Sequence, residues 1–140
     1  MSRILGIDFG TRRIGLALSD PTGTLASPLP FIENSGPQKV ATALQQLVQT
    51  YDIQTMVIGL PRNMDGTYGP AAQKVREFIA QIQPQLSAKI VSQDERLTTV
   101  QASRDLSQMG LNQRELRKKV DSSSACLILQ QFLDRPRLDP

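Results

Sequence analysis

The chain has 140 residues, a net charge of +3 and 39% hydrophobic residues, which is enough for one globular domain with a buried core. It contains no histidine and a single cysteine, Cys126. A Ser-His-Asp triad and an internal disulfide are therefore excluded within this chain, and a tetrahedral zinc site is disfavoured. No signal peptide precedes the first predicted strand, and no apolar run approaches the roughly 20 residues of a membrane span. We expect one cytoplasmic domain over residues 1–140, without a membrane partner.

The first predicted strand ends in a carboxylate. Residues 4–7 are apolar or glycine, and a second apolar run follows the turn at Gly10-Thr11. A run that is apolar on both faces indicates a central strand with structure on both sides. Asp8 would then lie at the end of a buried strand, where an ionised carboxylate needs compensation. Alternatively, Asp8 only binds the Gly10-Thr11 turn.

Two further strands are predicted over Arg13–Ser19 and Thr24–Ile32. Pro28 and Pro30 lack their N–H groups on the same side of the third strand, which suits an edge strand. Short connections make the three strands an antiparallel meander. A helix opening at Ser35-Gly36-Pro37 comes next.

Alternating strands and helices complete the first two thirds of the chain. Short apolar strands over Thr55–Leu60 and Lys89–Gln93 are separated by a helix that ends before Pro84. A strand, a helix and a strand in succession imply a crossover and parallel pairing. The order predicts a ribonuclease H-like α/β fold, with a mixed five-stranded sheet and helices on both faces.

The last third is predicted to be helical, with a helix over residues 98–110, a short basic segment opened by Asn112, and a helix over residues 121–133. Around that final helix, Ala125, Ile128 and Phe132 fall within about 40° of Asp121, so Asp121 shares the stripe that faces the sheet. The serines at 122–124 are expected to point elsewhere. The alternative is that Asp121 is only a helix N-cap.

Three carboxylates could meet in this layout. Asp8 ends the central strand, Glu95 follows a parallel strand at the same sheet edge, and Asp121 faces the sheet from the final helix. Alternation along the strand does not decide whether Asp94 or Glu95 points toward this site, so Asp94 is an alternative to Glu95. Acids converging without His or Cys suit Mg²⁺ or Mn²⁺. Such a site serves phosphoryl transfer, in which metal-bound water replaces a histidine base.

Basic residues are concentrated near these acids. Residues 96–119 carry six basic and two acidic side chains, an excess larger than the net charge of the whole chain. This indicates contacts with nucleic-acid phosphates, although a solvated helix face would show the same excess of basic residues.

The loop after the fourth strand leaves the carboxyl end of a parallel strand, which is the usual place for ligand contacts. Alternatively, this loop is only a turn. The candidate nucleic-acid contacts are Arg12, Arg62, Asn63, Asp65, Arg96, Arg117, Lys118 and Lys119.

Four motifs together resemble the YqgF family, also described as RuvX-like or as candidate Holliday-junction resolvases. They are residues 7–11 (IDFGT), 59–66 (GLPRNMDG), 94–99 (DERLTT) and 119–122 (KVDS). They occur in order and cover essentially the whole chain. The resemblance implies a ribonuclease H-like, metal-dependent nuclease with Asp8, Glu95 and Asp121 as its acidic set, and favours Glu95 over Asp94. It also implies maturation of the 5′ end of 16S ribosomal RNA.

Four functions are therefore compatible with parts of this sequence. The first is a nuclease for structured RNA, and the second is a resolvase that cuts branched DNA. Symmetric junction cleavage would call for two active sites and hence a dimer, but the sequence identifies no dimer interface and leaves the oligomeric state open. The third is a phosphate-binding domain like that of actin or Hsp70. Proteins of that class need two such domains around the nucleotide, and 140 residues supply one. The fourth function is a non-catalytic RNA-binding assembly factor.

Overall fold

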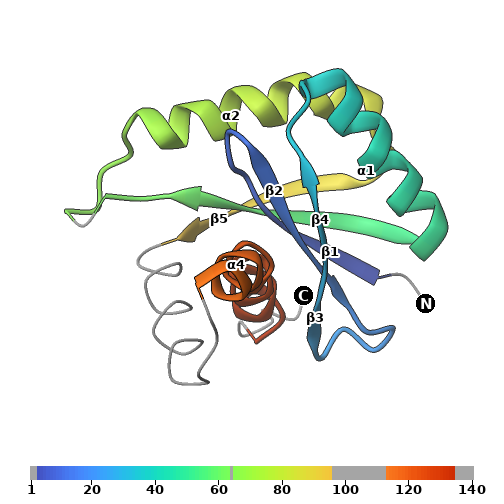
Figure 1. Ribbon diagram of the computed structural model, residues 1–140. Helices are drawn as coiled ribbons and strands as arrows, with labels where there is room; N and C mark the ends of the chain where they lie inside the picture. The colour runs from blue at the N-terminus through green and yellow to red at the C-terminus, as the bar shows by residue number, and fades with distance from the viewer. Residues whose placement is uncertain (1–2, 64, 96–112, 135–140) are drawn as a thin grey trace, which may run out of the picture.

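A mixed sheet lies at the centre of the computed structural model, which describes residues 3–63, 65–95 and 113–134, with the backbone alone described for residue 95 and residues 113–123. In this part of the chain the strand order is β3-β2-β1-β4-β5 (Figure 1). The elements are β1 Arg3–Asp8, β2 Arg13–Ser19, β3 Ala26–Glu33, α1 Pro37–Tyr51, β4 Ile53–Pro61, α2 Pro70–Ile82, the 3₁₀ turn η1 Gln83–Gln85, β5 Lys89–Glu95 and α4 Gln113–Asp134.

The predicted sheet topology is confirmed. β1, β2 and β3 pair antiparallel, whereas β1 with β4 and β4 with β5 pair parallel. β3 lies at the edge, where the two prolines cost the sheet no internal hydrogen bonds. β5 extends to Glu95, two residues further than predicted, because Leu60 and Pro61 of β4 continue the pairing to Asp94 and Glu95.

Helices α1 and α2 cover one face of the sheet, which we call the aliphatic face (Figure 1). The large side chains of the central strands, such as Leu5, Ile7 and Ile58, are fully buried there. They pack against α1 and α2 residues that include Leu44 and Phe78. Burying such side chains is the main contribution to the stability of a domain of this size.

Helix α4 covers the opposite face, which we call the α4 face (Figure 1). Its core is made of smaller residues, Ala17 and Ala125 with Leu129. Gly6 of β1 permits the close approach, because a Cβ atom built there would lie 2.7 Å from Leu129 Cβ and 2.9 Å from Ala125 O. At the start of β3, the side chain of Gln130 accepts a hydrogen bond from Ala26 N at 2.9 Å.

Helix α4 corrects three predictions. The basic segment and the final helix are one continuous 22-residue helix. Asp121 lies inside this helix, so its interpretation as an N-cap is wrong. Ser124 is fully buried rather than turned away, because it lies beside Ala125 on the packed face.

The predicted helix over residues 98–110 lies outside the described residues. No helix in the described part of the chain is long and apolar enough to cross a membrane.

Candidate active site at the carboxyl edge of the parallel strands

Asp8 is the last residue of the central strand β1 and is partly buried. Along this strand, Ile7 points into the aliphatic core, while Gly6 lies under α4. Phe9 returns to the aliphatic side, where its ring lies 4.6 Å from that of Phe78. The alternation of a strand therefore assigns the Asp8 side chain to the α4 face.

The turn after Asp8 is held by Asn34. The Asn34 side chain donates to Gly10 O at 3.0 Å, and its backbone N–H donates to Arg12 O at 2.9 Å. Gly10 has no space for a side chain, because a Cβ atom there would collide with the carbonyl oxygen of Arg13. The turn thus fixes the backbone that carries Arg12, whose side chain is exposed at the same edge as Asp8.

Residues at the end of β5 alternate between the two faces. Gln93 contacts α4, because its amide donates to Ile128 O at 3.1 Å and to Gln131 Oε1 at 3.3 Å. Asp94 binds groups on the other side. It accepts from the Tyr68 hydroxyl at 2.5 Å and forms an ion pair with Arg62 at 3.0 Å. The carboxylate that competed with Glu95 in the sequence is therefore engaged away from α4.

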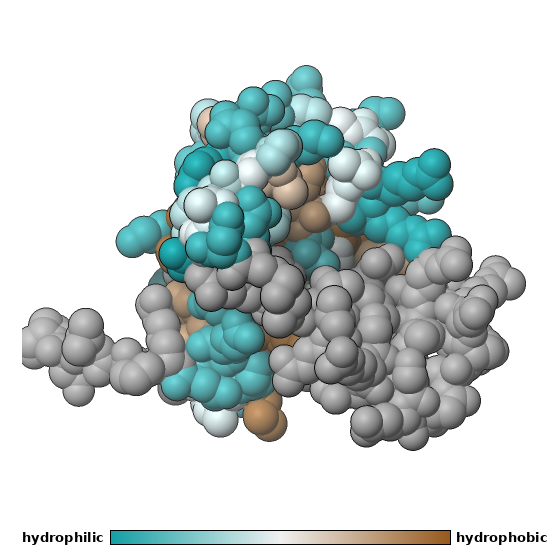
Figure 2. All heavy atoms as spheres, turned by 90° about the vertical axis from the view of Figure 1, so that its left-hand side faces the viewer, coloured by the Kyte–Doolittle hydropathy of each residue, from teal (hydrophilic) through white to brown (hydrophobic). Residues whose placement is uncertain are grey.

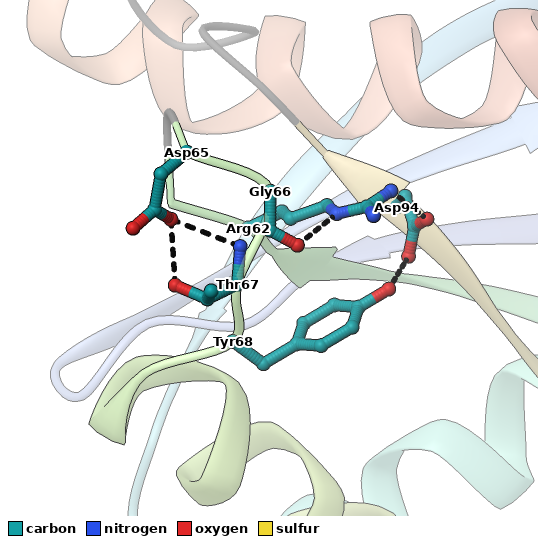
Figure 3. A network of polar contacts seen from close by, with 6 residues as sticks. All are labelled: Arg62, Asp65, Gly66, Thr67, Tyr68 and Asp94. Carbon is teal, nitrogen blue, oxygen red and sulfur yellow. Dashed lines mark hydrogen bonds and ion pairs between the residues drawn. The ribbon is translucent and has the colours of Figure 1, made fainter.

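The β4–α2 loop, residues 62–69, is tied together by its own hydrogen bonds. Arg62 Nε donates to Gly66 O at 2.6 Å, and Asp65 Oδ1 accepts from Thr67 N at 3.0 Å and from Thr67 Oγ1 at 2.6 Å (Figure 3). Asn63 Nδ2 donates to Thr67 Oγ1 at 3.1 Å. Gly66 has a φ of 91°, a conformation that favours glycine. These contacts agree with the interpretation of the loop as a turn, and the bonds of Arg62 and Tyr68 to Asp94 hold it beside the end of β5.

Tyr68 is a residue of this region that the sequence analysis did not single out. Its ring lies 5.4 Å from the Arg62 guanidinium carbon and 4.8 Å from that of Arg76 on α2. The hydrogen bond to Asp94, followed by desolvation, raises the pKa of the Tyr68 hydroxyl above its usual value. An exposed aromatic residue in a Gly- and Pro-rich loop at a strand end was the available signal.

Several predicted site residues lie wholly or partly outside the described part of the structure. Arg96 lies outside the described residues, as do the side chains of Glu95, Asp121 and the basic residues 117–119 of α4. Among the side chains that are described, no group of three acidic, His or Cys residues is placed to hold a metal ion. The side of the molecule at which β4 and β5 end is mostly hydrophilic over its described part (Figure 2).

Curated relatives match nearly the whole chain. A protein of Moorella thermoacetica is 44% identical over 133 residues, covering 95% of each chain. A protein of Roseiflexus sp. is 39% identical over 135 residues, covering 96% of each chain. Both are named "Putative pre-16S rRNA nuclease".

Solved structures with the same fold include Holliday-junction resolvases. The RuvC of T. thermophilus, in complex with a Holliday junction substrate, matches with a TM-score of 0.56 at 13% identity, over 95% of this chain and 94% of that chain. The Fowlpox virus resolvase matches with a TM-score of 0.55 at 12% identity, over 94% and 98%. The model of the family described as "RuvX: Holliday junction resolvase" matches residues 2–135, and the chain belongs to this family.

Proposed function

We propose that the protein is a nuclease that uses a divalent cation to hydrolyse phosphodiester bonds in structured RNA, and that it processes the 5′ end of the 16S rRNA precursor. The observation that carries the proposal is the position of Asp8, a partly buried carboxylate at the end of the central strand, on the face covered by α4. The names of the curated relatives support the RNA substrate.

Glu95 would contribute the second acid of this site. Its backbone continues β5 two residues beyond Gln93, which contacts α4. Because residues i and i+2 of a strand share a face, position 95 belongs to the same face as Gln93 and Asp8. The ion pair and hydrogen bond of Asp94 on the other side support this choice.

Asp121 would contribute the third acid from α4. Ala125, one turn after Asp121, contacts Gly6 of β1. Gln130 contacts the start of β3. The start of β3 pairs with the end of β2, which in turn lies beside Ile4 near the start of β1. Moving back along α4 from Gln130 to Ala125 therefore follows β1 towards its carboxyl end. The turn that contains Asp121 continues in the direction of Asp8.

A set of three carboxylates without His or Cys fits a hard cation such as Mg²⁺ or Mn²⁺. When bound, such ions activate water and neutralise charge on the phosphate that is cut. Asp8, Glu95 and Asp121 would hold them, and the protein would supply the fixed sheet edge and the helix that bring these three positions together.

Residues beside the acids would contact the nucleic acid, and the basic ones among them would bind its sugar-phosphate backbone. Arg12 and the β4–α2 loop residues Arg62, Asn63 and Asp65 belong to the edge where the strands end. The remaining proposed contacts are Arg96, Arg117, Lys118 and Lys119. Contacts with phosphates govern affinity more than sequence choice, so we expect recognition of RNA shape.

The decisive experiment incubates the purified chain with a 16S rRNA precursor and, separately, with a four-way DNA junction, each with Mg²⁺, with Mn²⁺ and with EDTA. Metal-dependent cleavage of the precursor that Asp8→Asn abolishes would support the proposal. Cleavage of the junction alone would favour the resolvase function in the description of the family model. Binding of RNA without cleavage under any condition would instead indicate an assembly factor.

A further inference from the structure

We infer that Asp94, held by Arg62 and Tyr68, is a positioning residue for the proposed active site: it fixes the end of β5, and with it the place of Glu95 relative to Asp8. The inference rests on the proposed function and deepens it. It assigns to Asp94, Arg62 and Tyr68 a role in catalysis that requires no contact with the substrate.

The first support is that both oxygens of the Asp94 carboxylate are bound. Oδ1 accepts from the Tyr68 hydroxyl at 2.5 Å, and Oδ2 accepts from Arg62 Nη1 at 3.0 Å. Figure 3 shows the two donors reaching Asp94 from the β4–α2 loop. Two bonds at different oxygens fix the rotation of a carboxylate as well as its position, so the residue before Glu95 is held in one orientation.

The second support is the place of this contact in the sheet. The pairing of β4 with β5 ends at Pro61 and Glu95, and in the described sheet β5 is an edge strand that pairs with β4 alone. Strand ends with a partner on one side open most readily. Arg62 directly follows Pro61, so the side-chain contact holds β5 to the loop at the point where the backbone pairing stops.

The third support is that the loop itself is fixed. Arg62 binds Gly66 O as well as Asp94, and Tyr68 lies against Arg76 of α2. The contact with Asp94 therefore connects β5 to α2 and to the turn at Gly66. A movement of β5 would have to break these bonds or move a helix that is packed on the core.

Solvent exposure indicates that the contact serves orientation more than stability. The side chains of Arg62 and Asp94 are 33% and 49% exposed, and ion pairs at such exposure contribute little to folding. The groups that hold a metal ligand in place typically change metal affinity or activity by about 10–100-fold when they are removed. Loss of the contact should thus weaken the metal site while leaving the fold intact.

The test compares three variants that lose different parts of the contact. Asp94→Ala loses both bonds, Tyr68→Phe loses the hydroxyl but keeps the ring, and Asp94→Asn keeps one oxygen to accept from Tyr68. Glu77→Gln, an exposed carboxylate on α2 whose partner is Gln73, is the matched control. For each variant, we would measure kcat and KM on the precursor, the melting temperature, and Mn²⁺ binding by calorimetry without RNA.

For Asp94→Ala we expect the Kd for Mn²⁺ to rise and kcat to fall by about 10-fold, with KM within about twofold of the unmodified chain. Tyr68→Phe and Asp94→Asn should show smaller changes in the same direction, and Glu77→Gln none. Combining Arg62→Ala with Asp94→Ala should add little to the changes in kcat and Mn²⁺ binding, because the two residues belong to one network, whereas the loss of Arg62 as a nucleic-acid contact would appear in KM.

Three results would overturn the inference while the proposed function stands. Unchanged Mn²⁺ binding and kcat in Asp94→Ala would show that β5 needs no such support. A raised KM with a changed salt dependence would show a direct substrate contact, and a large fall in melting temperature would show a structural role. If instead Asp8→Asn leaves cleavage and Mn²⁺ binding unchanged, the proposed function itself fails.

Discussion

The two faces of the sheet are built from different side chains. The aliphatic face buries large residues such as Leu5, Ile7 and Ile58 under two helices. The α4 face uses Gly6 and Ala17 against Ala125 and is bound to its helix by glutamines, Gln93 and Gln130. Apolar burial on the first face supplies most of the stability, whereas small and polar residues on the second let a helix approach the sheet closely.

This difference explains how one strand can serve both purposes. Ile7 and Asp8 are neighbours in β1, yet they belong to opposite faces. The aliphatic face can hold the strand in place while the other face carries an ionisable group at its edge. Substitutions on the two faces should therefore separate stability from activity.

The largest effect is expected for Asp8→Asn. Groups that only support a metal ligand cost about 10–100-fold on removal, so loss of a ligand should lower the cleavage rate by more than about 100-fold. The free energy of unfolding should change by less than about 1 kcal/mol, because no large apolar group is lost. Cleavage assays and urea unfolding on the same preparation would check both. An active Asp8→Asn variant would contradict the metal site.

Ile7→Ala tests the aliphatic face at the adjacent residue. Removal of a fully buried isoleucine side chain should lower the free energy of unfolding by about 2–5 kcal/mol through lost burial and a residual cavity. The cleavage rate per folded molecule should stay near that of the unmodified chain at a temperature at which the variant is folded. Urea denaturation gives the first quantity, and active-site-normalised kinetics give the second. A variant with intact stability would show that the core can close the gap.

Gly6→Ala should affect both properties. The added methyl group would meet Leu129 Cβ and Ala125 O at less than 3 Å, so α4 must move away from β1. Overpacking of this kind costs about 1–3 kcal/mol. Because α4 also carries Asp121, we expect cleavage to fall by more than the loss of folded protein explains. Equal activity in Gly6→Ala and the unmodified chain would show that the site tolerates a displaced helix.

Much of the fold could be predicted from local signals. The apolar runs, the turn residues and the prolines at 28 and 30 were sufficient for the antiparallel meander, for the edge position of its third strand and for the parallel pairing of the two later strands. The segment opened by Asn112 agrees with the start of α4 at Gln113, but its continuity with the final helix could not be predicted, because residues 113–120 are mainly charged or polar and carry no clear apolar period. Asp121 then resembled an N-cap, although the helix begins at Gln113.

The candidate site was predictable in its composition but not in its orientation. Alternation along β5 shows that Asp94 and Glu95 face opposite ways, but not which of them faces α4. The contact of Gln93 with Ile128 shows that Asp94, the next residue of β5, is directed away from α4, and it joins residues that are 35 positions apart. The Arg62–Asp94–Tyr68 network depends in the same way on the meeting of a loop with a strand.

Alanine at Arg117, Lys118 and Lys119 should have a graded effect on nucleic-acid binding. Each phosphate contact that is lost should reduce the slope of log K against log salt by about one unit. Binding should weaken similarly for RNA and DNA of different sequence, because phosphates carry no sequence information. Filter binding at several salt concentrations would measure this. A loss confined to one sequence would indicate contacts with bases instead.

The smallest effect concerns Cys126, a partly buried residue that packs against the α4-face cluster. Burial raises the pKa of its thiol to about 11, from 9.0. The folded chain therefore retains this proton above pH 9, where the unfolded chain releases it, so the free energy of unfolding should fall slightly as the pH rises from about 9 to 11.

Because Cys126 is the only cysteine, its reaction with a thiol reagent reports on one site. At pH 8, labelling should be slow in the folded protein and fast in guanidinium. Equal rates in both conditions would show that α4 does not shield the thiol.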